Sequence, residues 1–301
     1  MLAALLTTLC LAQQVPAGPT ADSHRREVEA WRAERLARLR GEGGWLSLAG
    51  LYWLKPGANR FGADRANDLV LPARVPARAG SFRLESGRVT VEALPGTPLM
   101  LAGKPITRAE LRSDAAGDPD VVALGDLTMQ VIARGERLGI RVKDPQSPAR
   151  QGFKGLSWFP VRPDYKVSAR FVPHPAPVSI AVPTVIGTTE TMPSPGSALF
   201  ELGGQSMRLD PVLEPGEARL FFIFRDATSG RSTYGGGRFL YADPPKEKHG
   251  SIVLDFNKAY SPPCAFTPYA TCPLPPAQNR LPIAIEAGEK APAPAAGAGH
   301  H

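Results

Sequence analysis

Cysteine and histidine are both scarce in this chain, with three cysteines and five histidines among 301 residues. Two of the histidines, His300 and His301, end the chain, and neither His174 nor His249 has a second histidine or a cysteine at the spacing of a metal site. The chain also has no G-x-S-x-G, H-E-x-x-H, Walker or dinucleotide-binding motif. We therefore predict no structural metal and no cofactor, and we leave open whether the protein is an enzyme.

Long hydrophobic runs are missing as well. The run at residues 1–12, MLAALLTTLCLA, is too short for a stable membrane span, so we predict no integral span. It resembles a secretory signal, and the small Ala12 allows cleavage near that position. Cys10 raises the alternative of a lipoprotein, but Leu9 is a poor fit to the small residue that such sites prefer. We expect export to the periplasm or the extracellular space, with lipid attachment as the weaker alternative.

Positive charge is concentrated rather than spread along the chain. The net charge is +7, and one N-terminal segment contains six arginines: Arg25, Arg26, Arg32, Arg35, Arg38 and Arg40. No recognition helix or zinc finger accompanies them, so we expect no nucleic-acid partner. We interpret these arginines as the solvated face of a helix.

The same segment has the pattern of an amphipathic helix. Asp22 and Ser23 are candidate caps, and a GEGG stop follows the last arginine. Four apolar residues recur near helical spacing: Val28, Trp31, Leu36 and Leu39. We predict a helix within residues 22–42 whose narrow apolar stripe packs on the outside of the following domain, with the arginines in solvent.

From Trp45 onward the pattern changes to short alternating runs separated by glycine, proline, asparagine and aspartate. No long helical segment interrupts these runs, and turn signals recur about every 8 to 12 residues, which is typical of all-β architecture. Ser86-Gly87, and less clearly Ala102-Gly103, have the composition of hairpin turns. We predict an all-β fold, in which an antiparallel β-sandwich is followed by a second β-sandwich or barrel.

We place the boundary between these two parts in the stretch RAELRSDAAGDPD, residues 108–120, which is rich in charged and small residues. We therefore place the first sandwich at residues 45–112 and a β-rich domain at residues 120–289. The remaining residues, 290–301, have no apolar periodicity and are expected to form a disordered tail.

The end of the second domain is rich in proline. The stretch SPPCAFTPYATCPLPPAQN, residues 261–279, permits neither a helix nor an inner strand, because proline fixes φ and removes a backbone donor. Cys264 and Cys272 are the only cysteines outside the leader, so in an oxidising compartment they are candidates for a disulfide; two buried free thiols are the alternative. We interpret the stretch as a rigid loop that walls a pocket, plugs the open end of a barrel, or does both.

Charged and amide side chains beside stiff loops are the candidate ligand-binding groups. In RLGIRVKD the charges could hold an anion or form an ordinary charge pair, and the glycines of STYGGGRF allow either a ligand or a neighbouring strand to approach. LDFNKAY delivers a carboxylate and an amide to the proline-rich loop. The candidates are Arg141 and Arg238 as anion donors, with Asp144, Asp255, Asn257 and Glu286.

The run PGANRFGADRANDLVLP, residues 56–72, resembles the early strands of a forkhead-associated domain, a β-sandwich that in its usual form binds phosphothreonine. The phosphate-binding positions of that family are not matched. Ala63 stands in place of an arginine, Pro76 and Ala79 in place of a serine and a histidine, and Ala102 in place of an asparagine. Phosphate capture needs converging donors, so we expect no phosphopeptide partner.

Five longer motifs lie between Trp31 and Lys290: WLSLAGLYWL, GANRFGADRANDLVLP, FKGLSWFPV, GRFLYADPP and LDFNKAYSPPCAFTPYATCPLPPAQNRLPIAIEAGEK. Together they resemble a bacterial family known only as domain of unknown function sixteen-eighty-four. The resemblance implies a fold with a distinctive C-terminal block, and it implies no activity.

These patterns predict an exported protein that binds a small polar or anionic ligand in a pocket capped by residues 255–289. Two alternatives stay open. One is a hydrolase that uses Asp255 and Glu286 as an acid/base pair. The other is an envelope protein without a ligand, in which the C-terminal block only locks the fold.

Overall fold

The structure, a computed structural model, describes residues 21–247 and 249–292. Apart from one long helix and several short helical turns, its elements are strands that pair mostly antiparallel in four sheets. The prediction of an all-β fold is therefore confirmed. Within the described residues, no helix is both long and apolar enough to cross a membrane. The predicted signal segment and residues 293–301 of the predicted tail lie outside the described residues.

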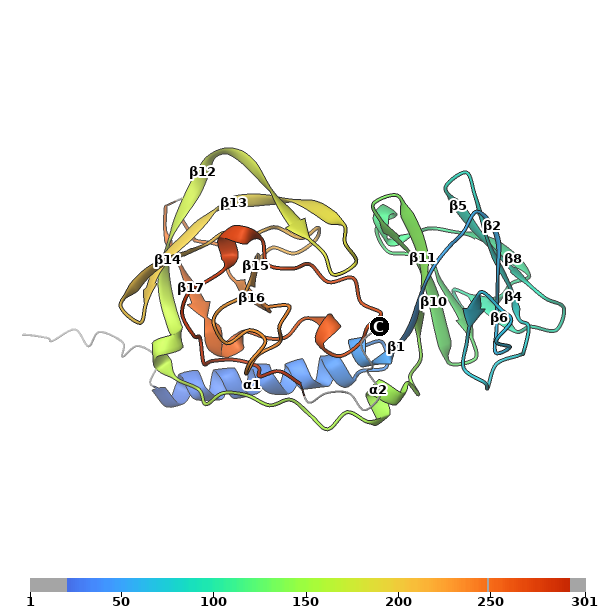
Figure 1. Cartoon of the computed structure of the whole chain (residues 1–301), viewed down its shortest axis with the longest axis horizontal. Coiled ribbons are helices and arrows are strands. Elements are labelled where there is room, and N and C mark those ends of the chain that lie inside the picture. The colour runs from blue at the N-terminus through green and yellow to red at the C-terminus, as the bar shows by residue number, and fades with distance from the viewer. Residues whose placement is uncertain (1–20, 248, 293–301) are drawn as a thin grey trace, which may run out of the picture.

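The first two sheets face each other across one hydrophobic core (Figure 1). Alternation along the strands turns every second side chain inward, as with Val89 and Val91 from one sheet and Met129 and Val131 from the other. We call this part the N-terminal sandwich. Its five-stranded sheet has the order β3 (Leu69–Val70), β2 (Gly57–Gly62), β4 (Gly80–Glu85), β5 (Arg88–Ala93) and β8 (Arg108–Leu111), and its six-stranded sheet the order β1 (Leu48–Trp53), β11 (Arg137–Lys143), β10 (Leu127–Arg134), β9 (Val121–Leu124), β6 (Leu99–Leu101) and β7 (Lys104–Pro105).

Two-residue turns close two hairpins of this sandwich, as the sequence predicted. Ser86-Gly87 joins β4 to β5, and Ala102-Gly103 joins β6 to β7. Both residues of each turn have positive φ, with 49° at Ser86 and at Ala102. This is the turn geometry that matches the twist of the flanking strands.

The predicted boundary at residues 112–120 falls inside this sandwich. β8 ends at Leu111 and β9 begins at Val121, yet β9, β10 and β11 belong to the same sheet as β1 and β6. β1 pairs along its length with β11, the last strand of the unit. The division at residue 112 is therefore corrected: the sandwich extends to Lys143, because its first strand needs its last strand as a neighbour.

A second β unit follows, which we call the C-terminal β unit. A four-stranded sheet packs through Val167, Phe200 and Leu254 against a two-stranded ribbon. Every residue of β15 in that ribbon is buried, because its two faces pack in different hydrophobic clusters. The sheet has the order β14 (Gln205–Leu209), β13 (Thr189–Leu202), β12 (Lys166–Pro183) and β17 (Ser251–Asp255), and the ribbon pairs β15 (Leu220–Phe224) with β16 (Arg238–Ala242).

The C-terminal block, residues 255–289, contains no strand beyond Asp255, the last residue of β17, and covers the second face of the β15–β16 ribbon. Ala270 and Cys272 of the block pack there in one cluster with Phe221 and Phe239. Short helical turns shape the block and the connections before it: η1 (Trp45–Ser47), η2 (Asp114–Ala116), α2 (Pro148–Gln151), η3 (Pro163–Tyr165), η4 (Phe256–Lys258), η5 (Pro263–Ala265) and η6 (Ala277–Asn279).

The long helix α1 (Ala21–Arg40) lies along the C-terminal β unit and the C-terminal block (Figure 1). The prediction that all its arginines are solvated is wrong for Arg35, which is 6% exposed. Arg35 donates to the carboxylate of Glu289 at 3.3 Å and to the carbonyl of Ser261 at 2.9 Å. Ion pairing therefore fastens the helix to the C-terminal block, in addition to its apolar stripe. The buried residues of the helix are His24, Val28, Arg35 and Leu39.

Candidate functional site

A cavity of about 1280 Å³ lies where the N-terminal sandwich, α1, the C-terminal β unit and the C-terminal block meet. Each part contributes to its wall, as Arg141, Arg35, Tyr241 and Thr271 do respectively. Small-molecule sites occur preferentially at such interfaces between units. Residues of the C-terminal block thus form part of the wall of a space large enough for a small ligand.

Arg141 is a buried cation in this wall. Its neighbours Ile140 and Val142 belong to the sandwich core, so strand alternation directs Arg141 away from that core. The residue is 6% exposed and its Nε has no hydrogen-bond partner among the described residues. No described carboxylate lies within 4.0 Å of it. Burial and the charge of Arg134 lower the pKa of Arg141 to about 10, which leaves it protonated at neutral pH.

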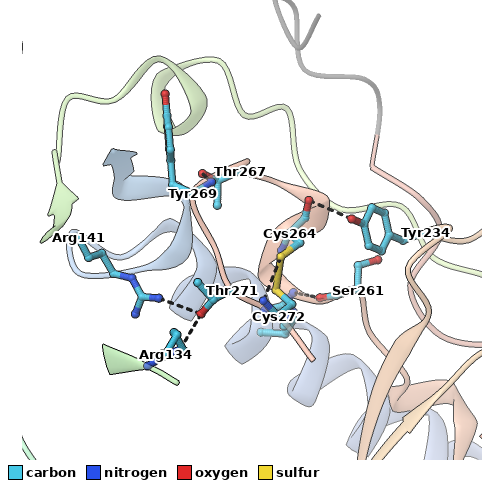
Figure 2. The surroundings of a disulfide bond; sticks show 10 residues. Arg134, Arg141, Tyr234, Ser261, Cys264, Thr267, Tyr269, Thr271 and Cys272 are labelled. Carbon is cyan, nitrogen blue, oxygen red and sulfur yellow. Dashed lines mark hydrogen bonds between the residues drawn. A yellow bond between two sulfur atoms is a disulfide. The ribbon is translucent and has the colours of Figure 1, made fainter. Parts of the chain in front are cut away.

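Thr271 joins two guanidinium groups, as Figure 2 shows. Its Oγ1 accepts hydrogen bonds from Arg134 Nε at 3.0 Å and from Arg141 Nη2 at 3.4 Å. Arg134 has carboxylate partners of its own, Asp114 at 2.8 Å and Glu190 at 4.0 Å. The Thr271 hydroxyl therefore accepts hydrogen bonds from Arg134, which has carboxylate partners, and from Arg141, which has none among the described residues.

A disulfide follows Thr271 directly in the chain. Cys264 and Cys272 are bonded, with their Cα atoms 6.1 Å apart, which confirms the predicted pairing. Cys272 lines the cavity, and its backbone N–H donates to the sulfur of Cys264 at 3.4 Å. The bridge therefore restrains the backbone that presents Thr271 to the arginines (Figure 2).

We expect Thr271→Val to lower the free energy of unfolding by about 1 kcal/mol, because Arg134 and Arg141 lose a shared acceptor while the volume of the side chain is kept. Urea unfolding followed by circular dichroism measures the change. Thr191→Val, at an exposed position of β13, is the control and should unfold like the wild type. Equal effects of the two substitutions would contradict this role of Thr271.

A second polar pair lies in the wall of the same cavity. The hydroxyl of Tyr241 donates to Glu214 Oε2, and the Tyr241 ring stacks on Phe221 with centroids 4.8 Å apart. Burial raises the pKa of Glu214, against the lowering effect of the hydrogen bond from Tyr241. The guanidinium of Arg219 lies 4.5 Å from the Tyr241 ring centroid, but it donates to both carboxylate oxygens of Glu217. Glu214 is therefore half-buried beside a cation that another carboxylate already binds.

Asp255, like Arg141, is a predicted site residue that lines the cavity, but its carboxylate is already occupied. Oδ2 lies 2.8 Å from His24 Nε2, and Oδ1 accepts from the side-chain and backbone amides of Asn257 at 2.9 and 3.2 Å. Asn257 itself is buried outside the lining, where it binds the backbone N–H and carbonyl of Arg162. These contacts join α1, β17 and the chain before β12.

Two more predicted residues are buried away from the cavity. Asp144 accepts from the guanidinium of Arg74, at 3.1 Å for Nη1, and from the backbone N–H of Gln146 at 2.6 Å. Arg238 has no exposed surface, pairs with Asp226 at 3.3 Å and donates to carbonyls of the C-terminal block. Both therefore hold the fold together and do not line the cavity.

Glu286 is exposed and does not line the cavity. The structure therefore does not bring it together with Asp255 in a shared cleft, and the predicted acid/base pair has no geometric support. In the described part of the chain there is also no group of three or more side chains that could hold a metal ion.

Sequence reasoning missed Arg134, Thr271 and Glu214. Alternation along β10 could have placed Arg134 on the outer face of the sheet, because Met129 and Val131 face the core. No local signal exists for Thr271, since its contacts with the two arginines span 137 and 130 residues of sequence. Glu214 directly precedes Pro215-Gly216, a composition that indicates a turn and gives no sign of a binding site.

The family described as "Protein of unknown function (DUF1684)" matches residues 151–290. An uncharacterized protein of Haloarcula marismortui, with a solution NMR structure, is 37% identical to this chain. The alignment covers 48% of this chain and 83% of that one, with a TM-score of 0.41. The chain belongs to the DUF1684 family. The motifs had predicted this membership over Trp31 to Lys290, a longer stretch than the one the family matches.

Forkhead-associated domains are also similar to this DUF1684 chain, at lower identity. One from a study of phosphothreonine-dependent interactions is 19% identical, covering 31% of this chain and 92% of that one, with a TM-score of 0.23. The FhaA forkhead-associated domain, in complex with the intracellular domain of Rv3910, is also 19% identical. That alignment covers 31% of this chain and 97% of that one, with a TM-score of 0.23. No curated protein matches the chain.

Proposed function

We propose that this DUF1684 protein binds a small anionic ligand, a carboxylate or a phosphate, in the cavity walled by the C-terminal block. The observation that carries the proposal is Arg141, a cation that is buried in the lining without a carboxylate partner among the described residues. A buried charge without an opposite charge beside it is costly, and an incoming anion compensates it. Arg134 and Thr271 add polar groups at the same place.

We further propose that the protein meets its ligand outside the cytoplasm. The signal-like segment at residues 1–12 supports export, and the Cys264–Cys272 disulfide suits an oxidising compartment. Cleavage is expected near Ala12. Mass spectrometry of the protein recovered from the periplasm or medium of a bacterial host tests this, because full-length protein retained in the cytoplasm would contradict it.

Titration calorimetry with acetate, succinate and inorganic phosphate tests the anion site. We expect at least one of these probes to bind the wild type and to bind Arg141→Met at least about tenfold more weakly. The ligand-free variant should be about 1 kcal/mol more stable than the wild type, because a packed apolar side chain replaces a buried charge.

Arg137→Met is the matched control, since Arg137 lies on the same strand, is exposed and does not line the cavity. It should leave probe binding unchanged. Absence of binding by all three probes to the wild type would refute the proposal, and so would equal binding by wild type and Arg141→Met.

A further inference from the structure

Among the charged side chains that line the cavity, one cation and one half-buried carboxyl group have no opposite charge within 4.0 Å in the described part of the chain. Among the described residues, every lining arginine or lysine except Arg141 has a carboxylate oxygen within 4.0 Å. Every lining acid except Glu214 and Asp243 has a basic side chain within the same distance. Asp243 is exposed, so water solvates it. Arg141 and Glu214 are thus the two buried or half-buried charged groups of the lining that have no opposite charge within 4.0 Å among the described residues.

The surroundings of Glu214 show why the protein itself does not neutralise it. One of its oxygens accepts the hydroxyl of Tyr241, which is a neutral donor. Arg219, whose charge acts on Glu214, makes two hydrogen bonds to Glu217, at 3.1 Å through Nε and at 2.6 Å through Nη2. Burial raises the pKa of Glu214, the direction expected of a carboxyl group that lacks a cation. A cation that entered the cavity would favour its ionised form.

We propose that the ligand is a zwitterion, whose carboxylate or phosphate binds Arg141 and whose protonated amine binds Glu214. The anionic end rests on the proposed function, and the cationic end is the addition. The charge of Glu214 favours an amine over a second anionic group, because a second anion would meet the carboxylate of Glu214.

A series of straight-chain ω-amino carboxylates, from glycine to 12-aminododecanoate, tests the proposal by calorimetry at neutral pH. Each is compared with the ω-hydroxy carboxylate of equal length, which has nearly the same shape and no positive charge. We expect one range of chain lengths, set by the spacing of the two groups, at which the amine binds at least about tenfold more tightly than the alcohol. Glu214→Gln should abolish this preference, because glutamine still accepts the Tyr241 hydroxyl but has no negative charge.

Asp243→Asn is the matched control, since Asp243 is the other lining acid without a basic side chain within 4.0 Å among the described residues. It should keep the preference for the amine. If the alcohols bind as tightly as the amines at every length, or if Asp243→Asn and not Glu214→Gln removes the preference, the zwitterion assignment is wrong. Anion binding that still depends on Arg141 would then leave the proposed function standing. The comparison of amine with alcohol uses the wild-type protein, so it decides the matter even if a variant does not fold.

Discussion

Arg238→Met is expected to lower the free energy of unfolding by about 3 to 5 kcal/mol. Arg238 has no exposed surface, and its partner Asp226 has a side chain that is 1% exposed. Removing the guanidinium leaves that carboxylate buried without its cation, with only neutral donors such as Thr228 Oγ1 and the backbone N–H of Ile285. The same guanidinium donates to the carbonyl of Ile285 and to that of Ala287, so the C-terminal block also loses two of its anchors.

Denaturant unfolding of the purified variant, followed by far-ultraviolet circular dichroism, measures this loss. Arg108→Met is the matched control, because Arg108 pairs with Glu92 across two strands but is 69% exposed; it should unfold like the wild type. Arg238→Lys keeps the charge without the forked donors, and we expect it to unfold between the wild type and Arg238→Met. A variant Arg238→Met as stable as the wild type would show that the buried network does not hold the block.

The strands follow from local sequence patterns, whereas the position of the domain boundary depends on a contact between distant strands. Alternation and hairpin turns such as Ser86-Gly87 depend on adjacent residues, so the all-β class and the turn positions followed from the sequence. The pairing of β1 with β11 joins the two ends of the sandwich, and no composition signal reports it. A charged linker between β8 and β9 therefore resembled a domain boundary although it lies within one folded unit.

The candidate site shows the same difference between local patterns and distant contacts. Alternation directs Arg141 away from the sandwich core, which made it a sound candidate for a ligand contact. Arg238 lies beside three glycines, which predicts a ligand contact, but carbonyls of the C-terminal block bind its guanidinium. Whether an arginine is free or paired depends on carboxylates from distant segments. Arg35 shows the same dependence, since its position on a basic helix suggested solvent and Glu289 of the C-terminal block holds it buried.

Replacing both disulfide cysteines, as Cys264→Ser with Cys272→Ser, is expected to lower the free energy of unfolding by about 2 to 3 kcal/mol. The bridge closes a loop between residues eight positions apart, and without it the unfolded chain gains the entropy that this closure removed. The lost restraint affects the segment that holds Thr271 in contact with Arg141 (Figure 2). We therefore expect the double variant also to bind anionic probes more weakly than the wild type.

A dithiol reductant supplies the control for this second prediction. Denaturant unfolding of the wild type should shift to lower concentration when the reductant is present, because reduction breaks the same bond that the double variant lacks. The double variant should unfold at the same concentration with and without reductant. A wild type that is equally insensitive would show either that the bond does not contribute to stability or that it is not formed in solution, and mass determination after thiol alkylation separates the two. If the bond is formed and contributes nothing, the hydrogen bonds and the packing of Cys272 with Phe221 and Ala270 alone hold the loop over the cavity.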